Sequence, residues 1–306
     1  MNNMPIPLQV VVVGQGAIGS LWSYYLNKSP HIKLSLLKTT KTSTAQSQQL
    51  TFTNANGLSY SYRCNLALES DIVSADLILV CLKSIHIVEQ LRKLSTLISK
   101  NTAIVLCHNG MGIINRLDST LDKKNIFTLL TTHGSYRTTK QHAIHTGIGH
   151  CDIGSSNSIL SNPPPWFKTL NQAFPKLYWH EDIVEKQWFK LAINCVINPI
   201  TAINNIQNGD VINQKYQPLI KEIASEVSEV AKKENIKLSA KDIIDTALKV
   251  AKSTQLNSSS MLSDILANRE TEVDNINGYI AKLAQQHNLN APVNQHLTTK
   301  VKALIK

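Results

Sequence analysis

Three polar side chains recur every four residues within one strongly apolar segment, and they are the first candidates for chemistry in this chain. Lys190, Asn194 and Asn198 are surrounded in the sequence by leucine, isoleucine, valine and alanine. In a helix, each step of four residues returns to nearly the same face, so the three side chains form one narrow line, here called the polar stripe. Unpaired polar groups on a buried helix cost roughly 1–3 kcal/mol each, so these groups need partners. We therefore place the chemistry at this stripe.

An alternative interpretation gives the polar stripe no ligand. Asn194 and Asn198 would then cap loops or neighbouring helices, and Lys190 would extend its ammonium group to water. Pro199 follows the stripe, lacks a backbone N–H, and would leave the carbonyl of Cys195 without its helical donor. The sequence thus predicts a kink beside the stripe.

A second candidate site lies near the N-terminus, where the apolar run Leu8–Val13 is followed at once by a glycine-rich segment. This glycine motif consists of Gly14, Gln15, Gly16, Ala17, Ile18 and Gly19. Helix-compatible residues come next, so the motif stands between a strand and a helix. In that context glycines allow a tight turn, close approach of a pyrophosphate and helix–strand packing, while the helix N-terminus attracts the phosphates. The motif predicts a dinucleotide-binding site.

The residues after the next expected strand, Ile32–Leu37, bear on which dinucleotide is bound. NAD-binding proteins place an Asp or Glu there to hold the ribose 2′-hydroxyl. This chain has Lys38 and Lys41 instead, and a lysine attracts the 2′-phosphate that a carboxylate would repel. The sequence therefore favours NADPH over NADH. The alternative is that both lysines only line a solvated loop.

Strand-like and helix-like segments alternate through the first half of the chain, which predicts a parallel sheet with helices between its strands. Further strands are expected at residues 76–82, 102–107 and 126–132, with a hairpin over residues 50–68 that turns at Asn56-Gly57. Ligands bind at the carboxyl ends of the strands in such sheets. The residues expected there are Gly14, Lys83, Asn109 and Thr132.

Helices are expected one after another from residue 183, at residues 183–203, 216–235, 240–255 and 270–287, so a domain boundary falls near residue 180. The second domain holds Asn257, Ser260 and Glu272, and the last two converge only if the chain bends between them. Glu272 lies at the edge of an apolar stripe and is a candidate for a partly buried carboxylate. The alternative is an exposed acid at the start of a helix, where the dipole favours it.

Composition excludes several classes of protein. The formal charge of +10 comes from dispersed lysines and arginines, which suits small anions better than nucleic acid. We find no segment typical of a signal peptide or a membrane span, so no membrane partner is expected. The five cysteines and ten histidines show no metal-ligand spacing, so we predict no metal site and reduced thiols in a cytoplasmic protein.

Four segments of the sequence resemble the ketopantoate reductase (2-dehydropantoate 2-reductase) family. The segments are Lys190–Ala202, His108–Gly112, Ser259–Leu262 and Glu272–Gly278. The resemblance extends from the glycine motif to about residue 290. It implies a Rossmann domain joined to an all-helical domain of the 6-phosphogluconate-dehydrogenase type.

Site roles follow from the resemblance position by position. Lys190 corresponds to the general acid, and Glu272 to the carboxylate that holds the substrate hydroxyl. The implied substrate-binding residues are Asn109, Asn194, Asn198, Asn257 and Ser260. The implied cofactor-binding residues are Gly14, Gln15, Gly16, Ala17, Ile18, Gly19, Lys38, Lys83, Asn109 and Glu272. The family often has Arg where this chain has Lys38, and lysine lacks the bidentate fork of arginine, so selectivity for NADPH could be weaker.

The sequence therefore predicts an α/β protein with an N-terminal Rossmann-type doubly wound parallel sheet, residues 1–180, and a C-terminal all-helical domain, residues 181–306. The expected function is NADPH-dependent reduction of ketopantoate to pantoate, in pantothenate and coenzyme A biosynthesis. The expected partners are a small 2-keto acid substrate and a second copy of the chain in a homodimer. The alternatives are another 2-keto acid reductase or an opine-type dehydrogenase on this fold, or a non-catalytic dinucleotide-sensing regulator.

Overall fold

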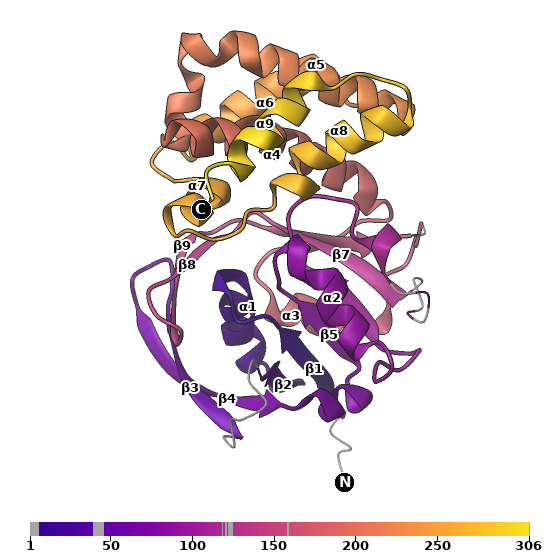
Figure 1. Ribbon diagram of the computed structural model, residues 1–306. Helices are drawn as coiled ribbons and strands as arrows, with labels where there is room; N and C mark the ends of the chain where they lie inside the picture. Colours follow the sequence, from indigo (N-terminus) through magenta and orange to yellow (C-terminus); the bar gives the residue numbers. More distant parts are fainter. Residues whose placement is uncertain are drawn as a thin grey trace. The chain divides into compact units, whose positions relative to one another are not determined.

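The computed structural model describes residues 6–38, 46–117, 119, 121, 125–157 and 159–305. The chain divides into two compact units (Figure 1). Unit 1 comprises Met1–His108 and Ile114–Ile183, and unit 2 comprises Asn109–Ile113 and Val184–Lys306. The short segment 109–113 thus belongs to the second unit although the sequence on both sides of it belongs to the first.

Unit 1 is built on an 11-stranded sheet with the order β11-β10-β7-β6-β5-β1-β2-β4-β3-β9-β8. Its central strands β4, β2, β1, β5, β6 and β7 all run parallel. Taken along the chain, they follow the doubly wound order 3-2-1-4-5-6 of dinucleotide-binding sheets. They span Leu8–Val13 (β1), Ile32–Leu37 (β2), Ser59–Ala67 (β4), Leu77–Val80 (β5), Ala103–Leu106 (β6) and Ile126–Thr131 (β7). The predicted Rossmann sheet is confirmed in these strands.

The remaining strands make the sheet mixed. Strand β3 forms the expected hairpin with β4, while β8 pairs antiparallel with β9, and β10 pairs antiparallel with β7. They span Ser47–Thr53 (β3), Gly134–Arg137 (β8), His142–Gly147 (β9), Cys151–Ser155 (β10) and Leu177–Trp179 (β11). The sequence analysis predicted the hairpin but none of the strands β8 to β11.

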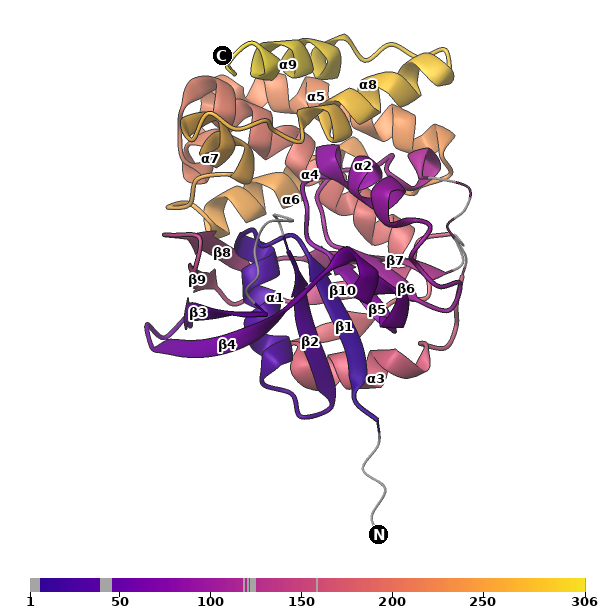
Figure 2. The ribbon, with the colours of Figure 1, turned by 60° about the horizontal axis from the view of Figure 1, so that its bottom comes forward.

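Helix α1 (Ala17–Asn27) is the element around which this sheet curves, because it contacts β1 to β4 and also β8 and β9 (Figure 2). Its side chains Leu21, Trp22 and Leu26 are fully buried. Trp22 stacks on Phe174 with ring centroids 4.2 Å apart, and Tyr24 stacks on Phe52 at 4.0 Å. The other helices of unit 1 are α2 (Ser84–Leu94) and α3 (Pro165–Ala173).

Unit 2 is helical and has a core of its own. Its helices are α4 (Ile183–Asn204), α5 (Gln217–Lys233), α6 (Ala240–Ser253), α7 (Ser260–Leu266), α8 (Asn277–Gln286) and α9 (Pro292–Lys302). The predicted helix over residues 270–287 is wrong at its start. Val273–Asn275 forms a short 3-10 helix instead, and α8 begins only at Asn277. The physical reason is that the side chains of Glu272 and Asn275 bond to the segment 109–113.

The described residues contain neither a membrane-spanning helix nor a cluster of metal ligands. None of their helices has both the length and the apolar character needed to cross a bilayer. None of their His, Cys, Asp and Glu side chains gather in a group of three or more that could hold a metal ion. The five cysteines are free thiols, and all of them are buried.

Candidate functional site

The glycine motif joins β1 to α1 in a conformation that needs glycine. Gly14 has φ +104°, and a Cβ there would lie 2.5 Å from the carbonyl oxygen of Cys81 at the end of β5. A Cβ on Gly19 would lie 1.9 Å from the carbonyl oxygen of Gly14. Gly16, in contrast, has open space where its Cβ would be, and it begins α1 without a side-chain cap. The loop is therefore tightly packed on one side and open at a helix N-terminus, which fits a pyrophosphate.

Gln15 is held by three groups that lie far away in the sequence. Its side-chain amide donates to the carbonyl of Leu37 at 3.2 Å, and its Oε1 accepts from Gln48 at 3.0 Å. The guanidinium of Arg137, on β8, donates to its backbone carbonyl. Burial lowers the pKa of Arg137 from its usual value. The sequence analysis did not find Gln48 or Arg137, because no local motif links them to the glycine motif.

The lysines proposed for the cofactor lie at two strand ends of unit 1. Lys38 directly follows β2, is partly exposed, and its backbone N–H donates to the carbonyl of Ala67 at 2.9 Å. Lys83 is partly exposed and is the residue from which α2 begins, just beyond β5. Lys41 lies outside the described residues. Because Gly14 packs on Cys81, the glycine motif meets the β5 end at the point where the sheet order reverses. Open α/β sheets bind ligands at this point.

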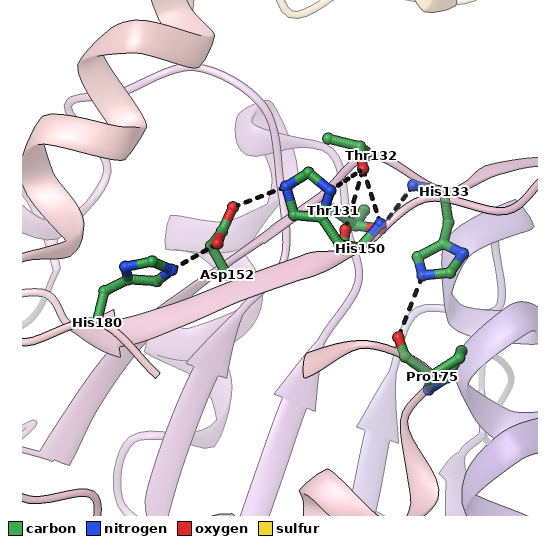
Figure 3. A network of polar contacts seen from close by, with 7 residues as sticks. All are labelled: Thr131, Thr132, His133, His150, Asp152, Pro175 and His180. Carbon is green, nitrogen blue, oxygen red and sulfur yellow. Dashed lines mark hydrogen bonds and ion pairs between the residues drawn. The ribbon is translucent and has the colours of Figure 1, made fainter. Parts of the chain in front are cut away.

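Thr132, at the end of β7, belongs to a polar network that no motif predicted (Figure 3). Its hydroxyl faces Nδ1 of His150 at 3.2 Å. The carboxylate of Asp152 lies between His150 Nε2 at 3.2 Å and His180 Nε2 at 2.5 Å. These contacts tie β7, β10 and the chain after β11 together, so the hydroxyl of Thr132 already has a structural partner.

In unit 2, two of the predicted site residues contact each other directly. The amide Nδ2 of Asn109 donates to Oε2 of Glu272 at 3.1 Å, and Glu272 is only 8% exposed. Met111 and Asn275 form two more hydrogen bonds, from the Met111 backbone N–H at 2.9 Å and to its carbonyl at 3.0 Å. The expected burial of the Glu272 carboxylate is confirmed, and the segments around residues 109 and 272 form one substructure.

The polar stripe lies on α4, as the fourfold spacing predicts. Asn198 is 5% exposed, whereas Lys190 and Asn194 are partly exposed, and the neighbouring Leu191 and Val196 are buried. A Lys and an Asn that remain partly accessible beside a buried apolar face can still meet a ligand.

Helix α4 is hydrogen-bonded to each of the other site segments. Gln187, one turn before Lys190, donates to the carbonyl of Gly110 at 3.3 Å. Thr201 donates to Oγ of Ser259 at 2.7 Å, at the point where α7 begins. Ser259 is buried, whereas Ser260 and Asn257 are exposed. The predicted substrate-binding residues of unit 2 therefore lie on segments that are fixed to one helix.

Comparison with known proteins gives the relationship directly. The family described as ketopantoate reductase PanE/ApbA matches residues 10–158, and the C-terminal model of the same family matches residues 182–305. The chain belongs to the ketopantoate reductase family. The family and the Rossmann-plus-helical fold that the sequence predicts are thus confirmed, and this ketopantoate reductase family member is an oxidoreductase by kinship.

The similarity of this family member to individual relatives extends over nearly its whole length. The 2-dehydropantoate 2-reductase of Vibrio cholerae is 31% identical over 301 residues, covering 97% of this chain and 98% of that protein. A solved D-mandelate dehydrogenase with NADH and anilino(oxo)acetate has a TM-score of 0.87 at 20% identity, covering 97% of this chain and 98% of its own. A dimeric ketopantoate reductase from Staphylococcus aureus has a TM-score of 0.80 at 20% identity with the same coverage. At these identities the two structures establish the fold alone.

Proposed function

We propose that this protein reduces ketopantoate to pantoate, using NADPH. The observation that carries the proposal is the hydrogen bond between Asn109 and the buried Glu272, in the same unit as the polar stripe of a ketopantoate reductase family member. A buried carboxylate that already has one oriented donor is a suitable acceptor for a substrate hydroxyl. Ketopantoate carries such a hydroxyl at the end opposite its keto acid.

The nucleotide fits the glycine motif, because Gly16 leaves open space at the uncapped N-terminus of α1. Gly14, Gln15, Gly16, Ala17, Ile18 and Gly19 would hold the pyrophosphate, with Lys83 at the neighbouring strand end. Lys38 would bind the 2′-phosphate, as a point charge without the fork of an arginine. When bound, the nicotinamide supplies the hydride for the C2 carbonyl.

Lys190 would stabilise the negative charge that grows on the carbonyl oxygen and would donate the proton to it. Help of this kind from a general acid is worth about 10²–10⁴-fold in rate, or roughly 3–5.5 kcal/mol. Asn194 and Asn198 continue the same helical face and would bind the polar atoms of the substrate. Asn257 and Ser260 would orient it further, including its carboxylate end.

Glu272 would recognise the substrate hydroxyl and also contact the cofactor, while Asn109 keeps its carboxylate in place. A site that is built to bond a hydroxyl rejects analogues without it, because its own buried group is then left unpaired. Specificity for ketopantoate over simpler 2-keto acids would therefore depend on Glu272.

The test follows NADPH absorbance with a panel of 2-keto acids that includes ketopantoate and its analogue without the terminal hydroxyl. We expect ketopantoate to have the highest kcat/KM, and we expect Glu272→Ala to remove most of its advantage over the analogue. A preference for another 2-keto acid would favour the broader reductase or the opine-type alternative. NADPH binding without any turnover would favour the dinucleotide-sensing regulator.

Assembly and location are part of the proposal. We propose a homodimer, which the dimeric Staphylococcus aureus structure supports, and light scattering of the purified protein tests it. We propose a cytoplasmic location, which the five free and buried thiols support. Fractionation of cells that produce the tagged protein tests this second point.

A further inference from the structure

Helix α4 lacks one internal backbone hydrogen bond, called here the break, and a side chain of another helix supplies the missing donor. Pro199 lies inside α4 and has no N–H, so the carbonyl of Cys195 lacks the donor that a regular helix would provide. The side-chain amide of Asn277, the first residue of α8, donates to this carbonyl at 3.0 Å. Asn277 is 0% exposed, so bulk water does not reach this side chain. The carbonyl that Pro199 leaves free is thus satisfied by one specific side chain.

Asn277 is held in place by two further residues. Its Nδ2 also donates to Oδ1 of Asn294 at 2.9 Å, and Nδ2 of Asn294 donates to Oε2 of Glu226 at 2.7 Å. The carboxylate of Glu226, on α5, also accepts the backbone N–H groups of Val293 and Asn294 at the start of α9. Asn277, Asn294 and Glu226 form a relay, called here the amide relay, that links four helices. These hydrogen bonds connect α4 through α8 and α9 to α5.

The side chain of Asn277 is oriented only by the hydrogen bonds that its amide group donates. Its amide group makes both hydrogen bonds described above, whereas its Oδ1 accepts none from any residue that the structure describes. A buried acceptor without a donor costs stability. The fold therefore keeps an amide here for the hydrogen bonds that it gives, and one of them ends on α4.

The position of the break connects it to the polar stripe. Asn194 precedes Cys195 and Asn198 precedes Pro199, so the break lies between the two asparagines of the stripe. Asn277 also follows Glu272 by five residues, in the same turn whose Asn275 bonds to Met111. The segment 272–277 is thus hydrogen-bonded both to the 109–113 segment and to α4 beside the break.

We propose that Asn277, through the carbonyl of Cys195, is a positioning residue that sets the angle between Asn198 and the earlier part of the polar stripe. The inference rests on the proposed function, because the stripe is its substrate-binding and proton-donating surface. Asn277 itself does not touch substrate. It acts by holding α4 at Pro199 with a side-chain donor where a regular helix would have a backbone N–H.

The experiment is a double-mutant cycle between Asn277→Ala and Pro199→Ala in the full-length protein. Each variant is measured for its urea unfolding midpoint, its NADPH affinity, and its kcat and KM with the 2-keto acid that the wild type reduces best. Asn277→Ala should lower the midpoint, because the Cys195 carbonyl loses its donor. Pro199→Ala should preserve or raise it, because the new N–H at position 199 can close the helix.

The two readouts separate positioning from mere stabilisation. In the double variant the midpoint should recover towards that of Pro199→Ala, since the carbonyl now has an internal donor. Turnover should not recover, because each variant changes the path of α4 around residues 195–199, either by removing the Asn277 donor or by adding an N–H at position 199. All three variants should lose about ten- to hundredfold in kcat, as small misplacements of reacting groups do. NADPH affinity should stay within about twofold, because the polar stripe and not the glycine motif is altered. Ser228→Ala, which removes another side-chain bond to a carbonyl of unit 2, is the matched control and should leave kcat unchanged.

Two outcomes would overturn the inference. The first is near-normal kcat in folded Asn277→Ala or Pro199→Ala. The second is an equal midpoint loss from Asn277→Ala in both backgrounds, which would remove the Cys195 carbonyl from the link. If Asn277→Ala does not fold, Pro199→Ala alone decides the catalytic question. Failure of the proposed function looks different, because the wild type itself would then reduce no 2-keto acid.

Discussion

His133 should make this protein lose stability in mild acid, because the fold holds this side chain in its neutral form. The ring is 6% exposed, and its Nε2 faces the carbonyl of Pro175 at 3.4 Å (Figure 3). Its Nδ1 accepts from the backbone N–H of Gly149 at 3.2 Å and lies 3.0 Å from Nε2 of His145. The hydrogen of His133 is therefore on Nε2, and a second one on Nδ1 would face the N–H of Gly149.

Burial, with repulsion from His145 added, lowers the pKa of His133 from 6.5 to about 4. Between these pH values the unfolded chain binds a proton that the folded chain does not bind. The stabilisation is thus fully present above pH 6.5 and is lost as the pH falls towards 4. A difference of this size corresponds to about 3 kcal/mol of unfolding free energy. Burial also lowers the pKa of His145, which adds to the loss in the same direction.

The assay is urea unfolding at several pH values from neutral down to about pH 4, with wild type compared with His133→Gln. Glutamine can still donate to Pro175 and accept from Gly149, but it does not titrate. We expect the wild type to lose about 3 kcal/mol more than the variant over this range. His86→Gln replaces an exposed histidine and should follow the wild type. Parallel pH profiles for wild type and His133→Gln would refute the reasoning, because they would mean that His133 titrates as it does in the unfolded chain.

Two further predictions concern the proposed reaction. Lys190→Ala should lower kcat by about 10²–10⁴-fold while the NADPH dissociation constant, measured by fluorescence titration, stays near that of the wild type; near-normal turnover would remove Lys190 from the role of general acid. Lys38→Asp should raise the KM for NADPH far more than that for NADH, whereas Lys38→Arg should sharpen the preference. Equal changes in both Michaelis constants would show that another residue binds the 2′-phosphate.

The parts of the fold that the sequence predicts well are those with a strong local signal. Strands β1 and β2 have the predicted bounds, because each is a mainly apolar run with a glycine motif or a charged loop at its end. Strand β9 was missed because its six residues include two histidines, a threonine and a glycine. Its buried His145 is stabilised by His133 and Tyr25, which lie 12 and 120 residues away. No local pattern encodes such partners.

The candidate site divides in the same way. The sequence was sufficient to place Lys190, Asn194 and Asn198 on one face of a helix, and to mark Glu272 as a candidate buried carboxylate. It could not give the partner of Glu272, because Asn109 lies 163 residues earlier. The wrong helix start before Asn277 has the same origin. Apolar periodicity continues through residues 272–276, but the side chains of Glu272 and Asn275 bond to a distant segment, and the α-helix begins only at Asn277.

Unit 2 buries several asparagine side chains, and each has a desolvation cost. Asn198, Asn275, Asn277 and Asn294 are all at most 5% exposed, although apolar side chains of similar size would fill such sites with less desolvation cost. Two of them donate directly to backbone carbonyls of α4 or of the 109–113 segment, a third supports one of those donors, and Asn198 lies on α4 itself. A fold that needed only a core would have no use for this arrangement, whereas the proposed site, with Lys190 and Glu272 in fixed orientations, would use it. The sequence could predict that Pro199 leaves the carbonyl of Cys195 without its helical donor, but the side chain that donates to this carbonyl is defined only when α4, α5, α8 and α9 are packed together.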